Sequence, residues 1–183
     1  MTCYLVIKLC KSWGLQIDKT EITVTSVASD IRGTTANLET GDILTVEQLL
    51  YGLTLPSGND AAFALAQFFG KDLFKRKYKP ADAEKIVSYQ FNYHQWYAKY
   101  FLKEMNLVAT KMGLANTHFD SPHGLMNIQN YSCAKDMCKL SAIAMRDDLF
   151  KKIVKTRFYE CTAKSKLDVD ERESPKTRKR KLA

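Results

Sequence analysis

The residues of this chain that could carry chemistry are Ser57, Gly58 and Asn59, which stand together in one short connection. A hydroxyl near a reacting serine can move protons, and a side-chain amide can hold the amide of a substrate, so the triplet suits serine acyl transfer. Serine and asparagine also favour turns and helix N-caps, which makes a purely structural role for Ser57 and Asn59 the alternative. The triplet alone does not decide between the two.

The chain contains one Ser-x-x-Lys sequence, which runs from Ser132 to Lys135. In such a motif, a lysine one helical turn after a serine can take the hydroxyl proton and activate a nucleophile. The structural interpretation is that Ser132 caps a helix over 132–146 and that Lys135 lies in solvent. His118 and His123 have no acidic or thiol partner at helical spacing, so we expect no metal site and a turn-stabilising role for His123.

Two helices are predicted to position the Ser-Gly-Asn triplet. Thr45 and Gln48 have the spacing of a capping box, so the first helix should begin at Thr45 and run to about residue 54. The second helix should cover 60–69 and end at Gly70, because glycine is common just after the last residue of a helix. The triplet would then form the turn between them.

The rest of the chain is predicted to be mostly helical with short strands. The patterns predict a buried helix over 1–13 that Gly14 ends, a strand over 21–28, and a loop over 32–42 in which a short strand pair is the alternative. They also predict a loop over 71–80, a helix over 81–112 that Gly113 ends, a loop over 116–130 and a strand from residue 158. Residues 164–183 are polar and basic, and we expect a disordered tail there. Residues 1–163 would belong to one domain.

Charge and cysteine content limit the class of protein. The net charge is +8, but five basic residues stand in the tail at 176–181, and no RNA-binding motif or zinc-finger spacing accompanies them. We therefore expect no nucleic-acid partner. The five cysteines include no Cys-x-x-Cys pair, which favours free and mostly buried thiols over a disulfide framework or a metal site. No cofactor is expected.

No stretch of the chain reaches the roughly 18 to 20 apolar residues that a membrane span requires. The sequence that follows Met1 also lacks the basic region and the small-residue cleavage site of a signal peptide. Taken literally, these features predict a cytosolic protein. That expectation lapses if the natural start lies upstream, so the compartment stays open. We also expect a monomer.

Four blocks of sequence stand in the order in which one enzyme family has them. The blocks are MTCYLVIKL, TVEQLLYGLTLPSGNDAAFALA, MGLANTHFDSPHGL and YSCAKDMCKL. Together they resemble the D-alanyl-D-alanine carboxypeptidase family, the low-molecular-mass penicillin-binding proteins, over residues 1 to about 161. The resemblance implies the α/β fold of β-lactamases and DD-peptidases, of which residues 1–163 would form mainly the helical region. With partner layers missing, the helix over 1–13 should expose apolar surface.

The resemblance also implies an activity. Members are serine peptidases that remove the terminal D-alanine of peptidoglycan peptides through an acyl-enzyme, bind β-lactams and are usually secreted or periplasmic. By this likeness Ser57 would carry protons to and from the leaving group, Asn59 would hydrogen-bond the substrate backbone, and Gly58 would belong to the substrate-binding loop. Ser132 aligns with the start of a structural helix in the family, which favours the N-cap interpretation.

Two family motifs have no counterpart in the chain. The nucleophilic serine and its lysine are expected just upstream of Met1. In place of Lys-Thr-Gly the chain has Lys176, Thr177 and Arg178, where arginine replaces the glycine that lets the substrate approach the backbone. We therefore expect the chain as given to be inactive and truncated at both ends. The alternatives are a non-catalytic relative that acts as a binding or scaffolding module, or a protein that binds polyanions through its basic tail.

Overall fold

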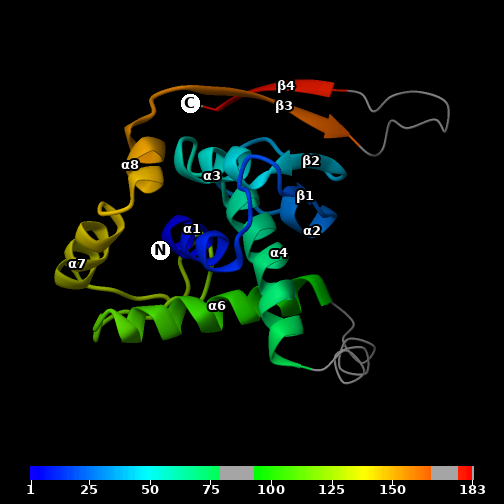
Figure 1. The fold of residues 1–183 in the computed structure, drawn as a ribbon. Helices are drawn as coiled ribbons and strands as arrows, with labels where there is room; N and C mark the ends of the chain where they lie inside the picture. Colours follow the sequence, from blue (N-terminus) through cyan, green and yellow to red (C-terminus); the bar gives the residue numbers. More distant parts are fainter. Residues whose placement is uncertain (79–92, 166–176, 183) are drawn as a thin grey trace.

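Four antiparallel strands form a sheet in the order β1-β2-β3-β4 along one side of the molecule, and the long helices lie beneath it (Figure 1). This computed structural model describes residues 1–78, 93–165 and 177–182. The elements are α1 (Thr2–Trp13), β1 (Glu21–Thr23), α2 (Ser26–Ser29), β2 (Asp42–Thr45), α3 (Val46–Thr54), α4 (Asn59–Lys77), α6 (Tyr93–Lys111), α7 (Ala134–Ala144), α8 (Asp148–Lys155), β3 (Tyr159–Ser165) and β4 (Thr177–Leu182). The chain is thus mostly helical with short strands, as predicted.

Helix α1 is largely buried, and only its polar side, with Lys8, Lys11 and Ser12, is exposed. Leu5, Val6 and Ile7 are at most 1 % exposed, and the helix packs against α3, α4, α6 and α8. None of the large exposed apolar side chains among the described residues belongs to α1. The expectation of an exposed apolar helix is therefore wrong, because the helices that follow in the chain fold back around it. Gly14 ends the helix with a φ of 68°, as predicted.

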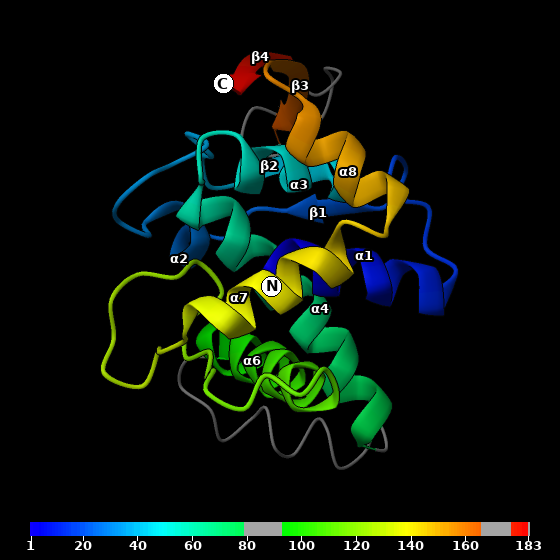
Figure 2. The same ribbon diagram turned by 90° about the vertical axis from the view of Figure 1, so that its left-hand side faces the viewer.

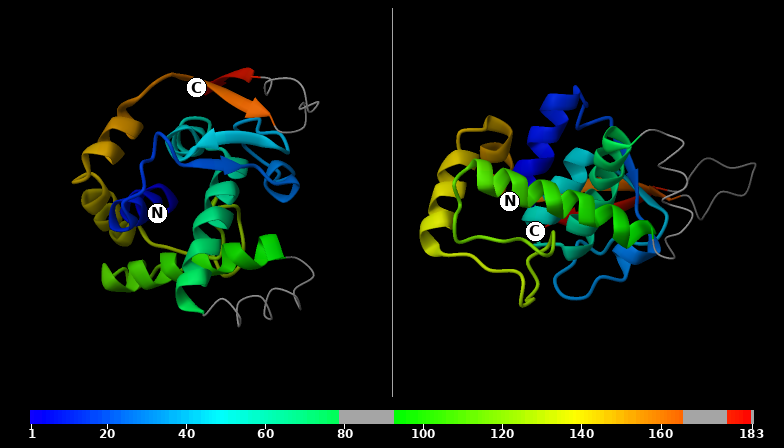
Figure 3. Two further views of the ribbon diagram at one scale, coloured as in Figure 1. Left: turned by 45° about the vertical axis from the view of Figure 1, so that its right-hand side comes forward. Right: turned by 90° about the horizontal axis from the view of Figure 1, so that it is seen from below.

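Helix α4 does not end at Gly70 but continues to Lys77, which corrects both the predicted helix end and the predicted loop over 71–80. Helix α4 crosses α6 (Figure 3), and Gly70 of α4 lies against Tyr97 of α6. A Cβ atom at this position would lie 2.0 Å from the carbonyl oxygen of Tyr97 on α6. Glycine is needed here for the close approach of two helices, and the nearby basic residues form the last turns of α4.

The predicted helix over 81–112 is confirmed from Tyr93 to Lys111, and its first residues lie outside the described part of the chain. Gly113 follows it with a φ of 67°. No described helix is long and apolar enough to cross a membrane.

Part of the basic tail is ordered as a strand, contrary to the prediction. Strand β4 pairs with β3 along its length, from Thr177 opposite Lys164 to Leu182 opposite Tyr159. The main-chain groups at the edge of β3 can pair with any extended segment, whatever its side chains, so the polar composition did not exclude a strand. Thr177 and Arg178 thus lie in β4, at the far edge of the sheet from β1.

Two local boundaries also differ from the prediction. The strand expected over 21–28 ends at Thr23, and the hydroxyl of Thr25 instead caps the short helix α2 by accepting from the amide of Ala28. Helix α7 begins one residue later than expected, with Cys133 at its N-cap position, so Ser132 is not the capping residue. Short polar side chains such as those of Thr25 and Ser132 are common at the ends of helices and strands, but they do not determine the residue at which an element begins or ends.

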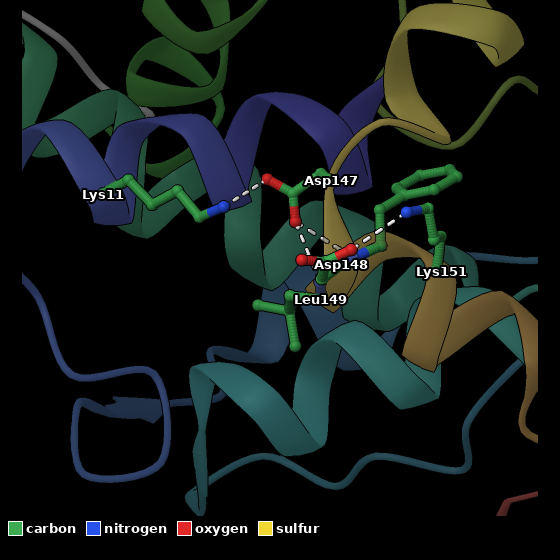
Figure 4. A network of polar contacts seen from close by, with 6 residues as sticks. Lys11, Asp147, Asp148, Leu149 and Lys151 are labelled. Atoms are coloured by element: carbon green, nitrogen blue, oxygen red, sulfur yellow. Dashed lines mark hydrogen bonds and ion pairs between the residues drawn. The ribbon is translucent and has the colours of Figure 1, made fainter.

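Helix α8 had no counterpart in the sequence analysis. Asp147 begins it, because its carboxylate accepts hydrogen bonds from the amides of Leu149 and Phe150. The same carboxylate forms an ion pair with Lys11 of α1, so one side chain caps α8 and ties it to α1 (Figure 4). Figure 2 shows α8 lying beside α1 and above α7.

All five cysteines are free, as predicted, and three of them are buried. Cys3 and Cys10 lie on the buried side of α1, where burial raises the pKa of each thiol to about 11. These thiols behave as small apolar side chains at neutral pH.

Candidate functional site

The connection between α3 and α4 holds Ser57 and Gly58 as predicted, whereas Asn59 is already the first residue of α4. Helix α3 begins at the predicted capping box, in which the Thr45 hydroxyl accepts from the Gln48 amide and the Gln48 side chain accepts from the Thr45 amide. Helix α4 begins at Asn59, with Gly58 as its N-cap residue. The end of α3 at Thr54 and the start of α4 at Asn59 therefore set the place of the triplet.

Gly58 fits its position because it has no side chain. A Cβ atom there would lie 2.6 Å from the carbonyl oxygen of Gly52, 2.8 Å from the Asp60 carboxylate and 2.9 Å from the amide of Ala36. Its amide donates to the same Gly52 carbonyl at 3.1 Å. The turn is thus held so closely against α3 and the 34–38 segment that no larger residue fits without a shift of main chain.

Ser57 is exposed and has a φ of 55°, a left-handed conformation that L residues other than glycine, asparagine and aspartate rarely adopt. Its carbonyl oxygen accepts a hydrogen bond of 2.5 Å from the Thr34 hydroxyl. Strained main chain of this kind is stable only where surrounding contacts determine it, and such residues are common at functional sites. The hydroxyl of Ser57 is therefore presented to solvent at a defined place.

Asn59 is only 3 % exposed, and its polar groups hold the preceding loop. Its side-chain nitrogen donates to the carbonyl of Arg32 at 2.9 Å, and its main-chain amide donates to the carbonyl of Thr34 at 2.9 Å. Gly33 lies between these two carbonyls, and a Cβ atom there would meet the Asn59 side chain at 2.5 Å. In this structure the side-chain nitrogen of Asn59 thus hydrogen-bonds the main chain of the preceding loop.

Asp60 organises the site, and the sequence analysis did not identify it. Its side chain is fully buried and accepts hydrogen bonds from the Thr35 hydroxyl at 2.6 Å and from the amides of Ala36, Leu38 and Ala61 at 2.8 to 3.1 Å. One carboxylate therefore fastens the loop before β2 to the first turn of α4. The signal in the sequence was an aspartate in the first turn of an otherwise apolar helix.

A cavity of about 420 Å³ lies beside the C-terminal end of α3. Its other walls are the start of α1, Met105 of α6 and the loop over 119–132. A 2.6 Å hydrogen bond from the Thr2 hydroxyl to the Pro122 carbonyl joins α1 to this loop. Thr54 lines the cavity, whereas Ser57 and Asn59 do not. The Ser-Gly-Asn turn therefore lies three residues beyond the cavity wall.

Ser132 also lines this cavity, but its surroundings are not those of a nucleophile. Its hydroxyl is 2.8 Å from the hydroxyl of Thr117, and Lys135 is exposed. Thr117 in turn donates to the carboxylate of Asp136, which is buried at the start of α7. The hydroxyl pair thus belongs to a polar network that fastens α7 to the loop before it.

His123 is half-buried in the loop that lines the cavity. Its Nδ1 atom accepts a hydrogen bond of 3.2 Å from the amide of Leu125, which agrees with the predicted role in a turn. Burial lowers the pKa of His123 from its ordinary value of 6.5, because the imidazolium form loses hydration there. The neutral ring that can accept from Leu125 is therefore the form that the fold favours.

We expect the free energy of unfolding to decrease as the pH falls below 6.5, and to decrease less in the variant His123→Asn. Between the two pKa values, His123 is protonated in the unfolded chain but still neutral in the folded chain. The free energy of unfolding therefore falls with the pH until the lower pKa of the folded state is passed. Urea denaturation between about pH 7.5 and pH 5.5 measures the difference. An equal loss of stability in both proteins would contradict this assignment.

Comparison with known proteins identifies relatives of this chain. The family model Peptidase_S11, described as D-alanyl-D-alanine carboxypeptidase, matches residues 97–181. A D-alanyl-D-alanine carboxypeptidase of Streptomyces sp. (strain K15) is 42% identical over 130 residues, which cover 71% of this chain and 38% of that protein. The carboxypeptidase DacF of Bacillus subtilis (strain 168) is 32% identical over 110 residues, or 60% of this chain and 22% of the relative.

Solved structures agree with these relatives. The crystal structure of the Streptomyces K15 DD-transpeptidase matches 99% of this chain with a TM-score of 0.74 at 33% identity, and the match covers 62% of that protein. The D-alanyl-D-alanine carboxypeptidase DacD of Francisella tularensis matches 87% of this chain with a TM-score of 0.68 at 26% identity, covering 32% of that chain. This chain therefore spans about a fifth to three fifths of the length of these relatives. Both the sequence matches and the fold show that the chain belongs to the D-alanyl-D-alanine carboxypeptidase family.

Proposed function

We propose that this chain supplies the Ser-x-Asn part of the active site of a serine-type D-alanyl-D-alanine carboxypeptidase. Such an enzyme removes the terminal D-alanine of a peptidoglycan peptide through an acyl-enzyme, and a β-lactam can take the place of the peptide. The observation that supports the proposal most strongly is the conformation of Ser57, whose exposed side chain stands on strained main chain in a turn held from both sides. A turn that served only to connect α3 and α4 would not need this strain.

In the proposed reaction the Ser57 hydroxyl passes a proton between the nucleophile and the leaving amine. Gly58 belongs to the substrate-binding loop, and the Asn59 side chain hydrogen-bonds the substrate amide. The Asn59 side chain hydrogen-bonds Arg32 in this structure. Direct binding of a substrate amide by Asn59 therefore requires the 32–34 segment to move, whereas Ser57 is already accessible.

An acyl-enzyme needs a nucleophilic serine, and the 183 residues contain one Ser-x-x-Lys, at Ser132. Since the Ser132 hydroxyl pairs with Thr117, we propose that it does not react. The chain as given would bind substrate weakly at the Ser57 turn and form no covalent intermediate.

Two measurements on the 183-residue protein test this proposal. A tripeptide ending in D-Ala-D-Ala should shift the amide resonances of Ser57 and Gly58 in ¹H–¹⁵N spectra, and a tripeptide ending in L-Ala-L-Ala should not. A fluorescent penicillin should leave no covalent adduct detectable by mass spectrometry. Failure of the D-Ala peptide to shift this turn would exclude the proposed site, and an adduct on Ser132 would overturn the assigned role of that residue.

The second candidate is a non-catalytic relative that uses the helical region as a binding module. The burial of α1 favours a stable domain, because an apolar helix left uncovered would cause aggregation. This candidate predicts a monodisperse protein with cooperative unfolding and no response of Ser57 to either peptide. The peptide titration above therefore separates the two candidates.

A further inference from the structure

A second cavity, of about 150 Å³, lies on a different part of α4 from the Ser-Gly-Asn turn. It is bounded by β1, the start of α2, α4 and α6, and its lining residues include Gln67, Lys71 and Tyr97. Gln67 follows Asn59 by about two helical turns, which corresponds to roughly 12 Å along the helix axis. This cavity is therefore separate from the site of the proposed reaction.

Gln67 carries a buried hydrogen-bond donor that has no partner among the described residues. The side chain is 6 % exposed, and its Nε2 atom makes no hydrogen bond to any residue that the structure describes. The Oε1 atom accepts a hydrogen bond of 2.8 Å from the hydroxyl of Thr25, which itself accepts from the amide of Ala28. With the Thr25 hydroxyl as the donor, the amide oxygen of Gln67 lies toward α2 and its nitrogen is the atom left without a hydrogen bond among the described residues. Buried polar nitrogens in native proteins almost always have a partner, so this one calls for an acceptor that the described chain does not supply.

The other lining residues define what that acceptor can be. Lys71 stands one helical turn after Gln67 on the same face of α4 and is exposed at the edge of the cavity. None of the lining residues that the structure describes is acidic, so this part of the cavity has a positive charge at its opening and a neutral donor inside. Apolar surface from Ile22, Ala64 and Phe68 covers much of the remaining wall.

We propose that this cavity binds a small monocarboxylate with an apolar body. One carboxylate oxygen accepts from Gln67 Nε2, the charge lies toward Lys71, and the apolar part packs against Phe68. A cavity of about 150 Å³ accommodates a molecule of about six heavy atoms, the size of benzene. An amino acid fits less well than a simple acid, because the described lining residues offer no carboxylate to form an ion pair with its ammonium group.

Titration of the 183-residue protein with sodium propionate, at constant ionic strength, tests the proposal. The side-chain NH₂ resonances of Gln67 should shift in ¹H–¹⁵N spectra with a dissociation constant in the millimolar range, as expected for so few contacting atoms. Propionamide, which keeps the acceptor but not the charge, should bind about tenfold more weakly. Unshifted Gln67 resonances, or equal binding of acid and amide, would overturn the proposal.

Variants of α4 assign the contacts. Lys71→Met should weaken propionate binding about tenfold, whereas Lys75→Met, one turn further along the helix and outside the cavity, should leave it unchanged. Gln67→Glu keeps the acceptor for Thr25 and replaces the donor by a carboxylate oxygen, so it should abolish propionate binding. Thermal unfolding of each variant checks that the fold is retained. Propionate binding that is equal in the two methionine variants would exclude Lys71, and binding by the glutamate variant would exclude Gln67.

Discussion

Replacing Asp60 by alanine should lower the free energy of unfolding by about 3 to 5 kcal/mol. The carboxylate is fully buried and is the acceptor for one hydroxyl and three main-chain amides, at Thr35, Ala36, Leu38 and Ala61. Its removal leaves buried donors without a partner, and each of these costs about 1 to 3 kcal/mol. Urea denaturation followed by circular dichroism measures the loss, as a lower midpoint at constant m.

The variant Asp60→Asn should be intermediate, since the amide keeps one acceptor oxygen but places two hydrogens among amides that need an acceptor. Asp18→Ala removes an exposed carboxylate and should change stability by no more than about 0.5 kcal/mol. If Asp60→Ala were as stable as Asp18→Ala, the loop over 34–38 could not depend on this carboxylate. In Asp60→Ala the amide resonances of Ser57 and Gly58 should also broaden or shift, because Asp60 holds the turn in place.

A Gly70→Ala substitution should destabilise the protein by about 2 kcal/mol or more, although alanine is the better helix former by about 1 kcal/mol. The added methyl carbon would lie 2.0 Å from the Tyr97 carbonyl oxygen, which is backbone and cannot rotate away. Helices α4 and α6 would have to separate. Phe69 and Phe101, which belong to the same buried core cluster, would then lose packing contacts. A lower free energy of unfolding would show that the contact with α6 dominates, and a higher one would show that helix propensity dominates.

Lys75→Ala is the matched control for this experiment. Lys75 is exposed on the same helix, so alanine there should have an effect close to zero. A Gly70→Ala protein that is more stable than the wild type would mean that α4 and α6 do not approach closely at this point. Chemical shifts of Tyr97 and its neighbours on α6 should move in the Gly70 variant and not in the Lys75 variant.

Local signals in the sequence were sufficient for several element boundaries. The capping box of Thr45 and Gln48 predicted the start of α3, and glycines predicted the ends of α1 and α6, at Gly14 and Gly113. These signals work because a helix end is a local event: a side chain within three residues supplies a missing acceptor, or a glycine adopts a positive φ. The position of the Ser-Gly-Asn turn between two helices was predictable for the same reason.

The roles of Gly70, Asp60 and strand β4 depend on partners far away in the sequence. The sequence predicts a helix end at Gly70, because glycine is typical both of a helix end and of a close helix crossing. The sequence alone does not distinguish these two situations. Asp60 binds a loop that precedes it by more than twenty residues, and β4 forms because β3 offers an open edge. Composition and periodicity carry no information about such pairings.

By itself, the sequence determined the family, the mostly helical character and the place of the Ser57 turn, because these depend on short blocks of adjacent residues. Only the tertiary structure decided that α1 is covered, that the Asn59 amide is bonded to Arg32, and that Gln67 has a buried donor beside a cavity. Each of these facts is a contact between distant segments, and its energy is set by burial and hydrogen-bond geometry that exist only after the chain has folded.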